Sequence, residues 1–346
     1  MDQDGKHPQP LSDELSGLWQ DVVEIPDALA ATLDEREGFD QAAGLFSARQ
    51  PSRLVVSGNG AAYYVASALW LASLAGPRPG PEVQAVPSGL LARGRFAWRP
   101  GDMFVAVSSS GEFRDLVEAI EQGAPKPYIA VTSSPASSVA RGAEVAVTFK
   151  VLHQRALTHS QVFCGAVATV LSIWASMTGD ALLSHQLGEL PALAGSAIKQ
   201  ASQWRNESLS ALGALPRVAL TCSSGAGWAA ALEAALLLKE VARVPAEGGE
   251  TREAATSGMY ALAPGDLAFT LPSGYEDPLL GEAEGIFERA GATVLRAPVP
   301  LTPVDQRLMG AVMFPASVAL AIKLARIAGH DPDEPTWADT YYETAR

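Results

Sequence analysis

The sequence has little cysteine, no excess of positive charge and no long run of purely hydrophobic residues. Its two cysteines, Cys164 and Cys222, lie among apolar or small residues, without the spacing of a metal site or a disulfide framework. With 38 acidic against 25 basic residues, the net charge is -13. This argues against nucleic acid and anionic membrane surfaces as partners, because both need a basic face. The negative net charge does not exclude a small anionic ligand, because a local binding site can be positive or rich in hydrogen-bond donors.

No segment has the composition of a signal peptide or a membrane span. The N-terminal MDQDGKHPQP is polar and lacks an apolar core, and the apolar stretch 161–177 contains polar residues and has flanks typical of a buried helix. The segment SGNGAAYY (57–64) lacks a complete G-x-G-x-x-G pattern, so a dinucleotide site is not expected. We expect a soluble cytoplasmic protein that needs no metal and no cofactor.

What the sequence does contain is an alternation of short apolar strands and helices. Strands are predicted at 53–57, 103–107, 127–131, 145–149, 217–221, 266–271 and 293–297. Because they show no period-2 polarity, they indicate parallel sheets buried on both faces. The strand, small-residue loop and helix unit recurs about 160 residues later, which favours two copies of one α/β fold.

This pattern divides the chain into three parts. We predict an N-terminal helical segment at 1–48, a first α/β domain at 49–195 and a second at 196–346.

The strongest candidate for an anion site is the loop VSSSGEFRDL, at 107–116. Ligands of doubly wound sheets lie beyond the carboxyl ends of the strands. The hydroxyls of Ser108, Ser109 and Ser110, with free amides at a helix start, suit a phosphate. The alternative is structural, because Ser109 and Glu112 have the spacing of an S-x-x-E capping box.

A predicted helix, AALEAALLLKEVARV, carries carboxylates in an otherwise apolar run. Glu233, Leu237 and Glu240 lie on one face of it. A carboxylate near the C-terminal end opposes the helix dipole, and a polar group placed against local energetics can indicate function. At the edge of a dry cleft, Glu240 would have a raised pKa and could transfer a proton. The alternative is a surface pair between Glu240 and Arg243.

Four segments occur in the order expected for a known family. They are ELSGLWQDVVEIPDALAATL, VAVSSSGEFRDLVEAI, ALEAALLLKEVARVPAE and GHDPDEP. Together they resemble the isomerase part of glucosamine-6-phosphate synthase and its relatives with two sugar-isomerase (SIS) domains, which include amino-sugar-phosphate deaminases and fructosamine-6-phosphate deglycases. The resemblance covers nearly the whole chain beyond residue 20. The sequence has no glutaminase domain, so glutamine-dependent synthesis is not implied.

The resemblance implies two flavodoxin-like SIS domains, each a five-stranded parallel sheet flanked by helices, and usually a homodimer. It implies a phosphorylated sugar or amino sugar as ligand. The implied binding residues are Ser57, Asn59, Ser108, Ser109, Ser110, Thr158 and Ser160. Glu240 corresponds to the residue that moves a proton between C1 and C2 of the open-chain sugar. His153 and His159 border the implied cleft, and either could act as an acid or base at neutral pH, although His153 also suits a solvated loop.

The chain departs from the family pattern at several catalytic positions. Thr256 stands where the ring-opening histidine would be, and Leu237 replaces the lysine that precedes the glutamate. In the phosphate loop, Phe113 replaces a threonine and Ser109 a glutamine. The family's late lysine has no counterpart in TWADTYYETAR. Ring opening therefore uses other groups, or the substrate is already open.

Three functional hypotheses follow. The first is an aldose–ketose isomerase or deaminase-like enzyme with Glu240 as the base. The second is a non-catalytic module that binds or senses a sugar phosphate, which the missing histidine and lysines favour. The third is a ligand-free assembly partner.

Overall fold

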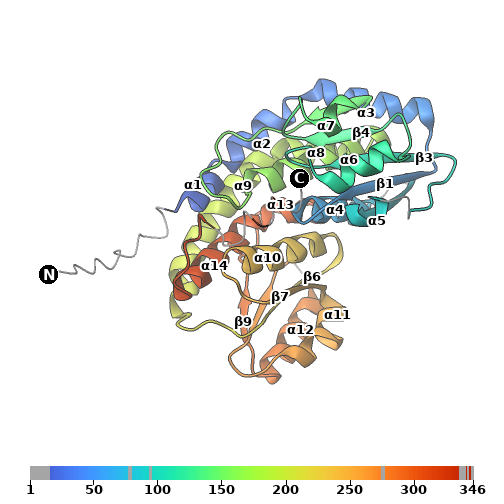
Figure 1. Ribbon diagram of the computed structural model, residues 1–346. Coiled ribbons are helices and arrows are strands. Elements are labelled where there is room, and N and C mark those ends of the chain that lie inside the picture. Colours follow the sequence, from blue (N-terminus) through green and yellow to red (C-terminus); the bar gives the residue numbers. More distant parts are fainter. Residues whose placement is uncertain are drawn as a thin grey trace.

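The structure is a computed structural model that describes residues 16–76, 80–92, 96–273, 277–334, 340 and 343. The start of the predicted N-terminal segment and most of the C-terminal tail lie outside these residues. The chain forms two halves stacked on one another, each built on a parallel sheet with helices on both sides (Figure 1).

The first half contains a five-stranded sheet, as predicted. Its strands are β1 (Arg53–Gly58), β2 (Glu82–Pro87), β3 (Asp102–Val107), β4 (Ile129–Thr132) and β5 (Val145–Thr148), in the order β2-β1-β3-β4-β5. Its helices are α1 (Gly17–Val23), α2 (Ile25–Leu33), α3 (Arg36–Arg49), α4 (Ala61–Ala75), α5 (Ser88–Leu91), α6 (Arg114–Glu121), α7 (Ser138–Arg141), α8 (Gln161–Thr178) and α9 (Ala181–Glu207). Helix α9 continues across the predicted boundary between residues 195 and 196. The domain ranges remain predictions.

The second half repeats this topology with a smaller sheet. Its strands are β6 (Ala219–Ser223), β7 (Ala246–Glu250), β8 (Leu267–Thr270) and β9 (Thr293–Arg296), in the order β7-β6-β8-β9. Its helices are α10 (Trp228–Glu240), α11 (Thr251–Thr256), α12 (Pro278–Arg289), α13 (Met309–Val312) and α14 (Phe314–Ile327), and short 3-10 turns include η5 (Gly258–Ala261) and η6 (Gln306–Leu308).

The prediction of five strands in this second sheet is wrong for the described residues, which form four. The segment that follows β9 carries Pro298, Pro300 and Pro303. Proline cannot donate a ladder hydrogen bond, so the chain passes into η6 instead of adding a strand.

An ion pair at the amino end of each sheet supports the duplication. Arg53 and Asp102 join the starts of β1 and β3, with Nη2 2.6 Å from Oδ2. Arg217, just before β6, and Asp266, just before β8, lie at the same distance. Each pair is separated by 49 residues in the sequence. The same two positions of the repeated unit therefore hold its two central strands together.

The central strands β1, β3 and β4 are apolar along most of their length because helices cover both faces of the sheet. Val56 and Val105 contribute to a core with α4 and α8, whereas Val55 and Phe104 contribute to a separate cluster with α6 and α7. Successive side chains of a strand point to opposite faces, so a strand covered on both sides has no polar positions.

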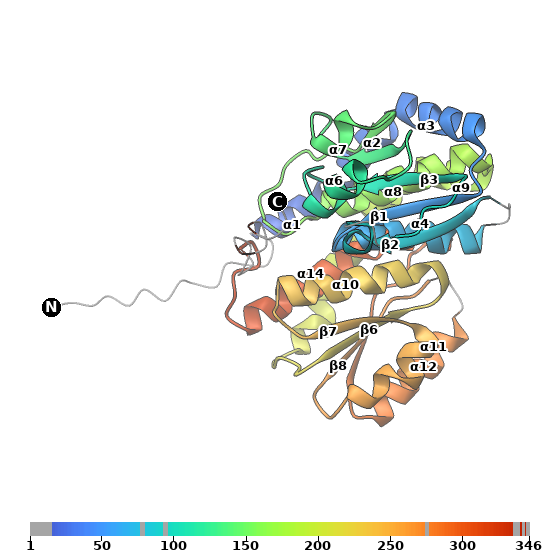
Figure 2. The ribbon, with the colours of Figure 1, turned by 45° about the vertical axis from the view of Figure 1, so that its right-hand side comes forward.

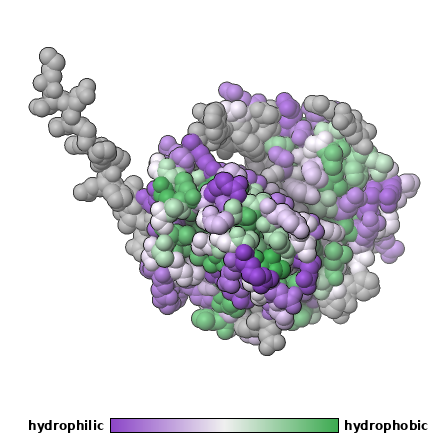
Figure 3. Space-filling model, turned by 90° about the horizontal axis from the view of Figure 1, so that it is seen from below, coloured by the Kyte–Doolittle hydropathy of each residue, from purple (hydrophilic) through white to green (hydrophobic). Residues whose placement is uncertain are grey.

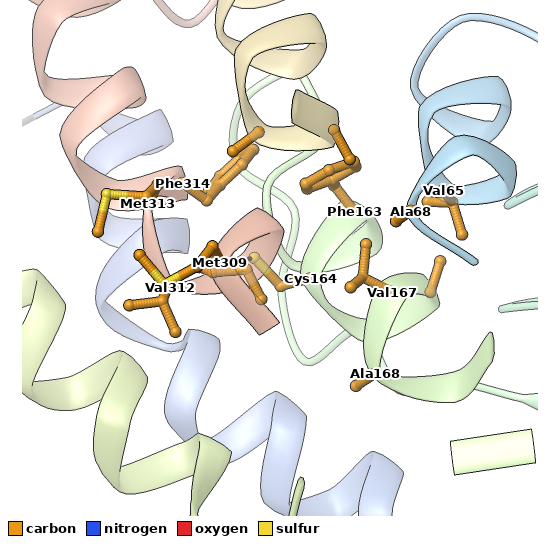
Figure 4. Close-up of a cluster of buried hydrophobic side chains, with 14 of the residues drawn as sticks. Val65, Ala68, Phe163, Cys164, Val167, Ala168, Met309, Val312, Met313 and Phe314 are labelled. Carbon is orange, nitrogen blue, oxygen red and sulfur yellow. Dashed lines mark hydrogen bonds between the residues drawn. The ribbon is translucent and has the colours of Figure 1, made fainter. Parts of the chain in front are cut away.

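The largest core is shared by both halves. Figure 4 shows side chains from α4 and α8 gathering with those of α13 and the start of α14. On the far face of the second sheet, α11 and α12 cover a smaller cluster, whereas α10 lies on the face toward the first half (Figure 2).

Within the described ranges, two helical stretches, Gln161–Thr178 and Gln306–Ile327, are long and apolar enough to cross a membrane by length and composition alone. They are 83% and 94% buried inside the fold, as expected for core helices of a soluble α/β protein. The surface of the second half, seen from below in Figure 3, mixes hydrophilic and hydrophobic residues.

Candidate functional site

The three-serine loop follows β3 at the carboxyl edge of the first sheet. Ser108 is buried, and its Oγ accepts a hydrogen bond from the amide of Gly111 (3.1 Å). Ser110 is exposed, and its Oγ accepts one from the amide of Glu112 (3.3 Å). The amides of Ser109 and Ser110 have no hydrogen-bond partner among the described residues. The loop therefore offers free amides and hydroxyls to an anion.

The loop after β4 supports the serine loop. Thr132 Oγ1 and Ser133 Oγ donate hydrogen bonds to the carbonyl oxygen of Ser109 (2.8 and 3.0 Å). Gly111 has a φ of 63°, and a Cβ on it would lie 2.0 Å from Ser137 Oγ. Glycine is needed there both for the backbone angle and for the close approach of the two loops.

The capping-box interpretation of this loop is wrong. Phe113 is the N-cap of α6, and no side chain caps that helix. Ser109 Oγ lies 3.1 Å from Ser133 Oγ, and Glu112 accepts a hydrogen bond from the amide of Ser138 (2.8 Å) at the start of α7. Both residues join the two loops to each other and leave the start of α6 uncapped.

Two fully buried serines lie where the neighbouring strands end. Ser57, in β1, and Ser88, directly after β2, are both 0% exposed, and neither Oγ has a hydrogen-bond partner. A buried hydroxyl without a partner costs about 1–3 kcal/mol, so such groups call for an explanation. Because β2, β1 and β3 are adjacent, Ser88, Ser57 and Ser108 follow one edge of the sheet. The family resemblance named Ser57 as a candidate, whereas Ser88 was not predicted.

The segment between β5 and α8 carries three more predicted residues. Thr158 is 4% exposed and its Oγ1 has no partner, and Ser160, the buried N-cap of α8, makes no side-chain capping bond. His159 is half-buried, and burial lowers the pKa of its imidazole below the ordinary value. His159 is therefore neutral at pH 7 and can either donate or accept a proton.

Ion pairs with the N-terminal helices hold this segment in place. Arg155 contacts Asp21 (2.8 Å) and Glu24 (2.7 Å), and the hydrogen bonds from Arg155 lower the pKa of Glu24 to about 2. His153 Nδ1 lies 2.8 Å from Glu24 Oε2 and is exposed. His153 thus belongs to this surface cluster and not to the serine loops.

The late GHDPDEP motif has a structural role within the described residues. The Asp333 carboxylate accepts hydrogen bonds from the amides of Gly17 (2.6 Å) and Leu18 (2.8 Å), at the start of α1. Its carbonyl oxygen accepts one from the amide of Leu157 (3.0 Å). The motif therefore fixes the segment that contains Thr158.

Helix α10 carries two carboxyl groups with raised pKa values. Glu233 is 3% exposed, its Oε2 has no partner, and burial, with the nearby charge of Glu240, raises its pKa far above the usual range. Solvent reaches Glu240, yet the surrounding protein displaces enough water to raise its pKa to about 7, against the charge of Lys239. No ion pair joins Glu240 to Arg243 among the described residues, so the surface-pair interpretation is wrong.

Helices α4 and α10 pack against each other in opposite directions. The Trp70 and Trp228 rings meet edge to face with centroids 6.2 Å apart. Toward the other end of the contact, burial and the charges of Glu233 and Glu240 raise the pKa of Tyr64. Since α4 starts at the turn after β1, the Glu240 end of α10 lies beside the carboxyl edge of the first sheet.

Helix α8 reaches the same place. Burial and the Glu233 carboxylate raise the pKa of the Cys164 thiol, and the amide of Cys164 donates to the carbonyl oxygen of Ser160. Cys164 therefore lies one turn into α8, close enough for the Glu233 charge to act on its thiol. Helix α4 packs against both α8 and α10, so side chains from both halves of the chain meet in one core beside the helix that carries Glu233.

Three other positions named in the sequence analysis are Asn59, in the turn between β1 and α4, and Thr256 and Leu237, where the family has catalytic groups. Asn59 is exposed next to Gly60, whose φ is 55°. Thr256 is exposed, and its Oγ1 donates to the carbonyl oxygen of Arg252 within α11 (2.8 Å). Leu237 is 0% exposed and part of the core.

No metal centre is formed in the described part of the chain. It contains no group of three or more His, Cys, Asp or Glu side chains placed to hold a metal ion. The chemistry available at the cluster is hydrogen bonding from hydroxyls and amides, and proton transfer by carboxyl, phenol and imidazole groups.

Comparison with known proteins confirms the resemblance predicted from the sequence. No family model matches the chain. The chain is 25% identical over 353 aligned positions to the isomerizing glutamine–fructose-6-phosphate aminotransferase of Aeropyrum pernix, covering 92% of this chain and 55% of that protein. The chain thus spans about half the length of the curated relative.

The fold matches solved structures of the same kind of protein. The C-terminal domain of glucosamine-fructose-6-phosphate aminotransferase from Francisella tularensis has a TM-score of 0.77 at 17% identity, covering 97% of this chain and 100% of that one. Glucosamine-6-phosphate deaminase from Thermotoga maritima has a TM-score of 0.73 at 16% identity, covering 93% and 98%. The chain has the fold of the SIS proteins.

Proposed function

We propose that this chain binds a phosphorylated sugar or amino sugar beyond the carboxyl ends of β2, β1 and β3. The free amides of Ser109 and Ser110 and the Ser110 hydroxyl would hold the phosphate. Ser57 and Ser88, which are fully buried and have unpartnered hydroxyls, would form the floor of this edge beneath the sugar. The names of the relatives, which refer to fructose 6-phosphate and glucosamine 6-phosphate, support this ligand class.

We further propose catalysis of aldose–ketose isomerisation or deamination through an enediol- or enediolamine-type proton transfer. The observation that carries this proposal is Glu240, a solvent-reached carboxyl with a pKa of about 7 beside the edge of the first sheet. A general base works best when its pKa is near the working pH. Glu240 would take the proton from C2 and return it to C1. His159, neutral at pH 7, would assist ring opening.

A non-catalytic sugar-phosphate-binding or regulatory protein is the second candidate. This candidate is favoured because two positions that hold catalytic groups in the family hold Thr256 and Leu237 in this chain. The Thr256 hydroxyl is used inside its own helix, and Leu237 is buried in the core. Neither can supply the missing histidine or lysine.

Replacing Glu240 by glutamine separates the two candidates. Wild-type protein and Glu240→Gln would be tested with fructose 6-phosphate and glucosamine 6-phosphate, by thermal shift for binding and by product analysis for turnover. We expect Glu240→Gln to keep the thermal shift and to lose turnover by about 10²–10⁴-fold, since it removes the proton acceptor but not the phosphate contacts. Glu247→Gln, at an exposed position of β7, is the matched control.

Stabilisation of the wild-type protein without any product would support the binding protein. Turnover by Glu240→Gln equal to that of the wild type would remove Glu240 from the mechanism.

We also propose a homodimer located in the cytoplasm, in keeping with the resemblance to SIS proteins. Light scattering of the purified chain at several concentrations tests the oligomeric state, and a monomer at all of them would contradict it.

A further inference from the structure

Moving a hydrogen from C2 to C1 also requires proton transfers at the sugar oxygens O1 and O2. A carboxylate that acts at carbon leaves these oxygens to another group. The two replaced positions, Thr256 and Leu237, do not supply it, so a different group beside Glu240 is needed.

Tyr64 has the position for this task. It lies in α4, just after the turn that follows β1, and it is half-buried against the shared core. Because α4 and α10 are antiparallel, and because helical side chains lean toward the start of their own helix, Tyr64 and Glu240 lean toward each other. No hydrogen bond of the Tyr64 hydroxyl is found among the described residues.

We propose that the Tyr64 phenol carries the proton between O1 and O2 of the sugar while Glu240 carries the proton between C2 and C1. This inference rests on the proposed function of the site. It assigns to α4 of the first half the acid–base role that the family sequence pattern leaves vacant in this chain.

The two transfers balance without any other reactant. In the first step Glu240 takes the C2 proton, the C1–C2 double bond forms, and O1 takes the Tyr64 proton to give the enediol. In the second step the O2 proton returns to the Tyr64 phenolate and the C2=O2 bond forms. The electron pair of the C1–C2 double bond then takes the proton from Glu240 at C1. Both side chains end in their starting states.

The charge around Tyr64 suits a proton donor. Burial and the charges of Glu233 and Glu240 raise the pKa of its hydroxyl above the ordinary value. The phenol therefore stays protonated throughout the pH range in which Glu240 ionises.

Tyr64→Phe tests the proposal because it keeps the ring and removes only the hydroxyl. Isomerisation of fructose 6-phosphate, which carries oxygen on both C1 and C2, would be measured, together with thermal stabilisation by inorganic phosphate. We expect kcat to fall by about 10²-fold or more, with KM and the phosphate-induced shift unchanged. The control is Tyr63→Phe, which removes the hydroxyl of the neighbouring tyrosine. The ring centroids of Tyr63 and Tyr64 are 6.0 Å apart, and we expect this variant to have wild-type kcat and KM.

The possible outcomes separate this proposal from the one on which it rests. If Glu240→Gln is inactive while Tyr64→Phe keeps the wild-type kcat, the role of Tyr64 is overturned and the proposed function stands. A loss of both kcat and the phosphate-induced shift in Tyr64→Phe would mean a structural role and would also overturn the proposal. A wild-type protein that converts neither sugar would overturn both proposals together.

Discussion

The Glu240 carboxyl group is exposed to solvent, yet its pKa is raised. Its pKa in the folded chain is about 7, against an ordinary value of 4.5. Between these values the folded chain holds a proton that the unfolded chain has released. The contribution of Glu240 to stability therefore decreases as pH rises from 4.5 to about 7 and is constant above that. The proposed general base thus lowers the stability of the fold above pH 4.5.

Glu240→Gln should reverse that loss. We expect the variant to gain about 1–2 kcal/mol over the wild type at pH 8 and little at pH 4.5, below the full linkage value because water screens the exposed carboxylate. Urea unfolding at the two pH values measures the difference. An equal effect at both pH values would show that the carboxyl group has an ordinary pKa in the folded chain.

At the residue scale, the sequence named the serines of the β3 loop and Glu240 as candidates, but not Ser88 or Tyr64. Ser108 and Glu240 stand out because polar groups interrupt apolar patterns. Ser88 follows a strand without a clear pattern, and Tyr64 occupies an ordinary position in an apolar helix. Tyr64 becomes a candidate only because α10 packs beside α4, and Ser88 only because β2 lies beside β1. Such contacts between distant parts of the chain cannot be read from a local sequence pattern.

At the scale of the element, the apolar central strands were predicted, and the strands β2 and β7 were missed. Both are edge strands with a single neighbour in their sheet. Strand β2 is only partly buried and ends in proline, and β7 has the sequence AEGGE. Gly248 in β7 is needed because a Cβ there would lie 2.6 Å from the Ala231 carbonyl oxygen of α10. Tertiary packing, and not strand propensity, places these residues in a sheet.

The two repeated ion pairs should differ in their contribution to stability. Arg53 is 4% exposed and also contacts Gln84 (2.8 Å), whereas the Arg217 side chain is 64% exposed. Arg53→Met leaves Asp102 buried without its partner and should cost about 3–5 kcal/mol. Arg217→Met should cost at most about 1 kcal/mol, because Asp266 keeps hydrogen bonds from two backbone amides.

Urea unfolding of the two variants, measured in parallel, tests this difference. Equal costs would mean that the exposure of Arg217 does not determine how much its ion pair contributes.

At the scale of the whole molecule, the shared core should make the two halves unfold together. Helices α4 and α8 of the first half and α10, α13 and α14 of the second bury their apolar side chains in one cluster. Separating the halves would expose this apolar surface to water, at a free-energy cost of about 25 cal/mol for each Å² exposed. We therefore expect one calorimetric transition, with equal calorimetric and van't Hoff enthalpies. Two resolved transitions would show that each half is stable alone.

The antiparallel contact between α4 and α10 has one more consequence. The proposed phosphate-binding loop follows β3 of one sheet and the proposed base Glu240 lies on α10 of the other half, so the distance between them depends on how the two sheets are oriented. A rotation of a few degrees about the tryptophan pair would change the reach of the base while leaving the loop intact. Selectivity among sugars of different chain length would then be tuned by substitutions at this pivot, far from any atom that touches the ligand.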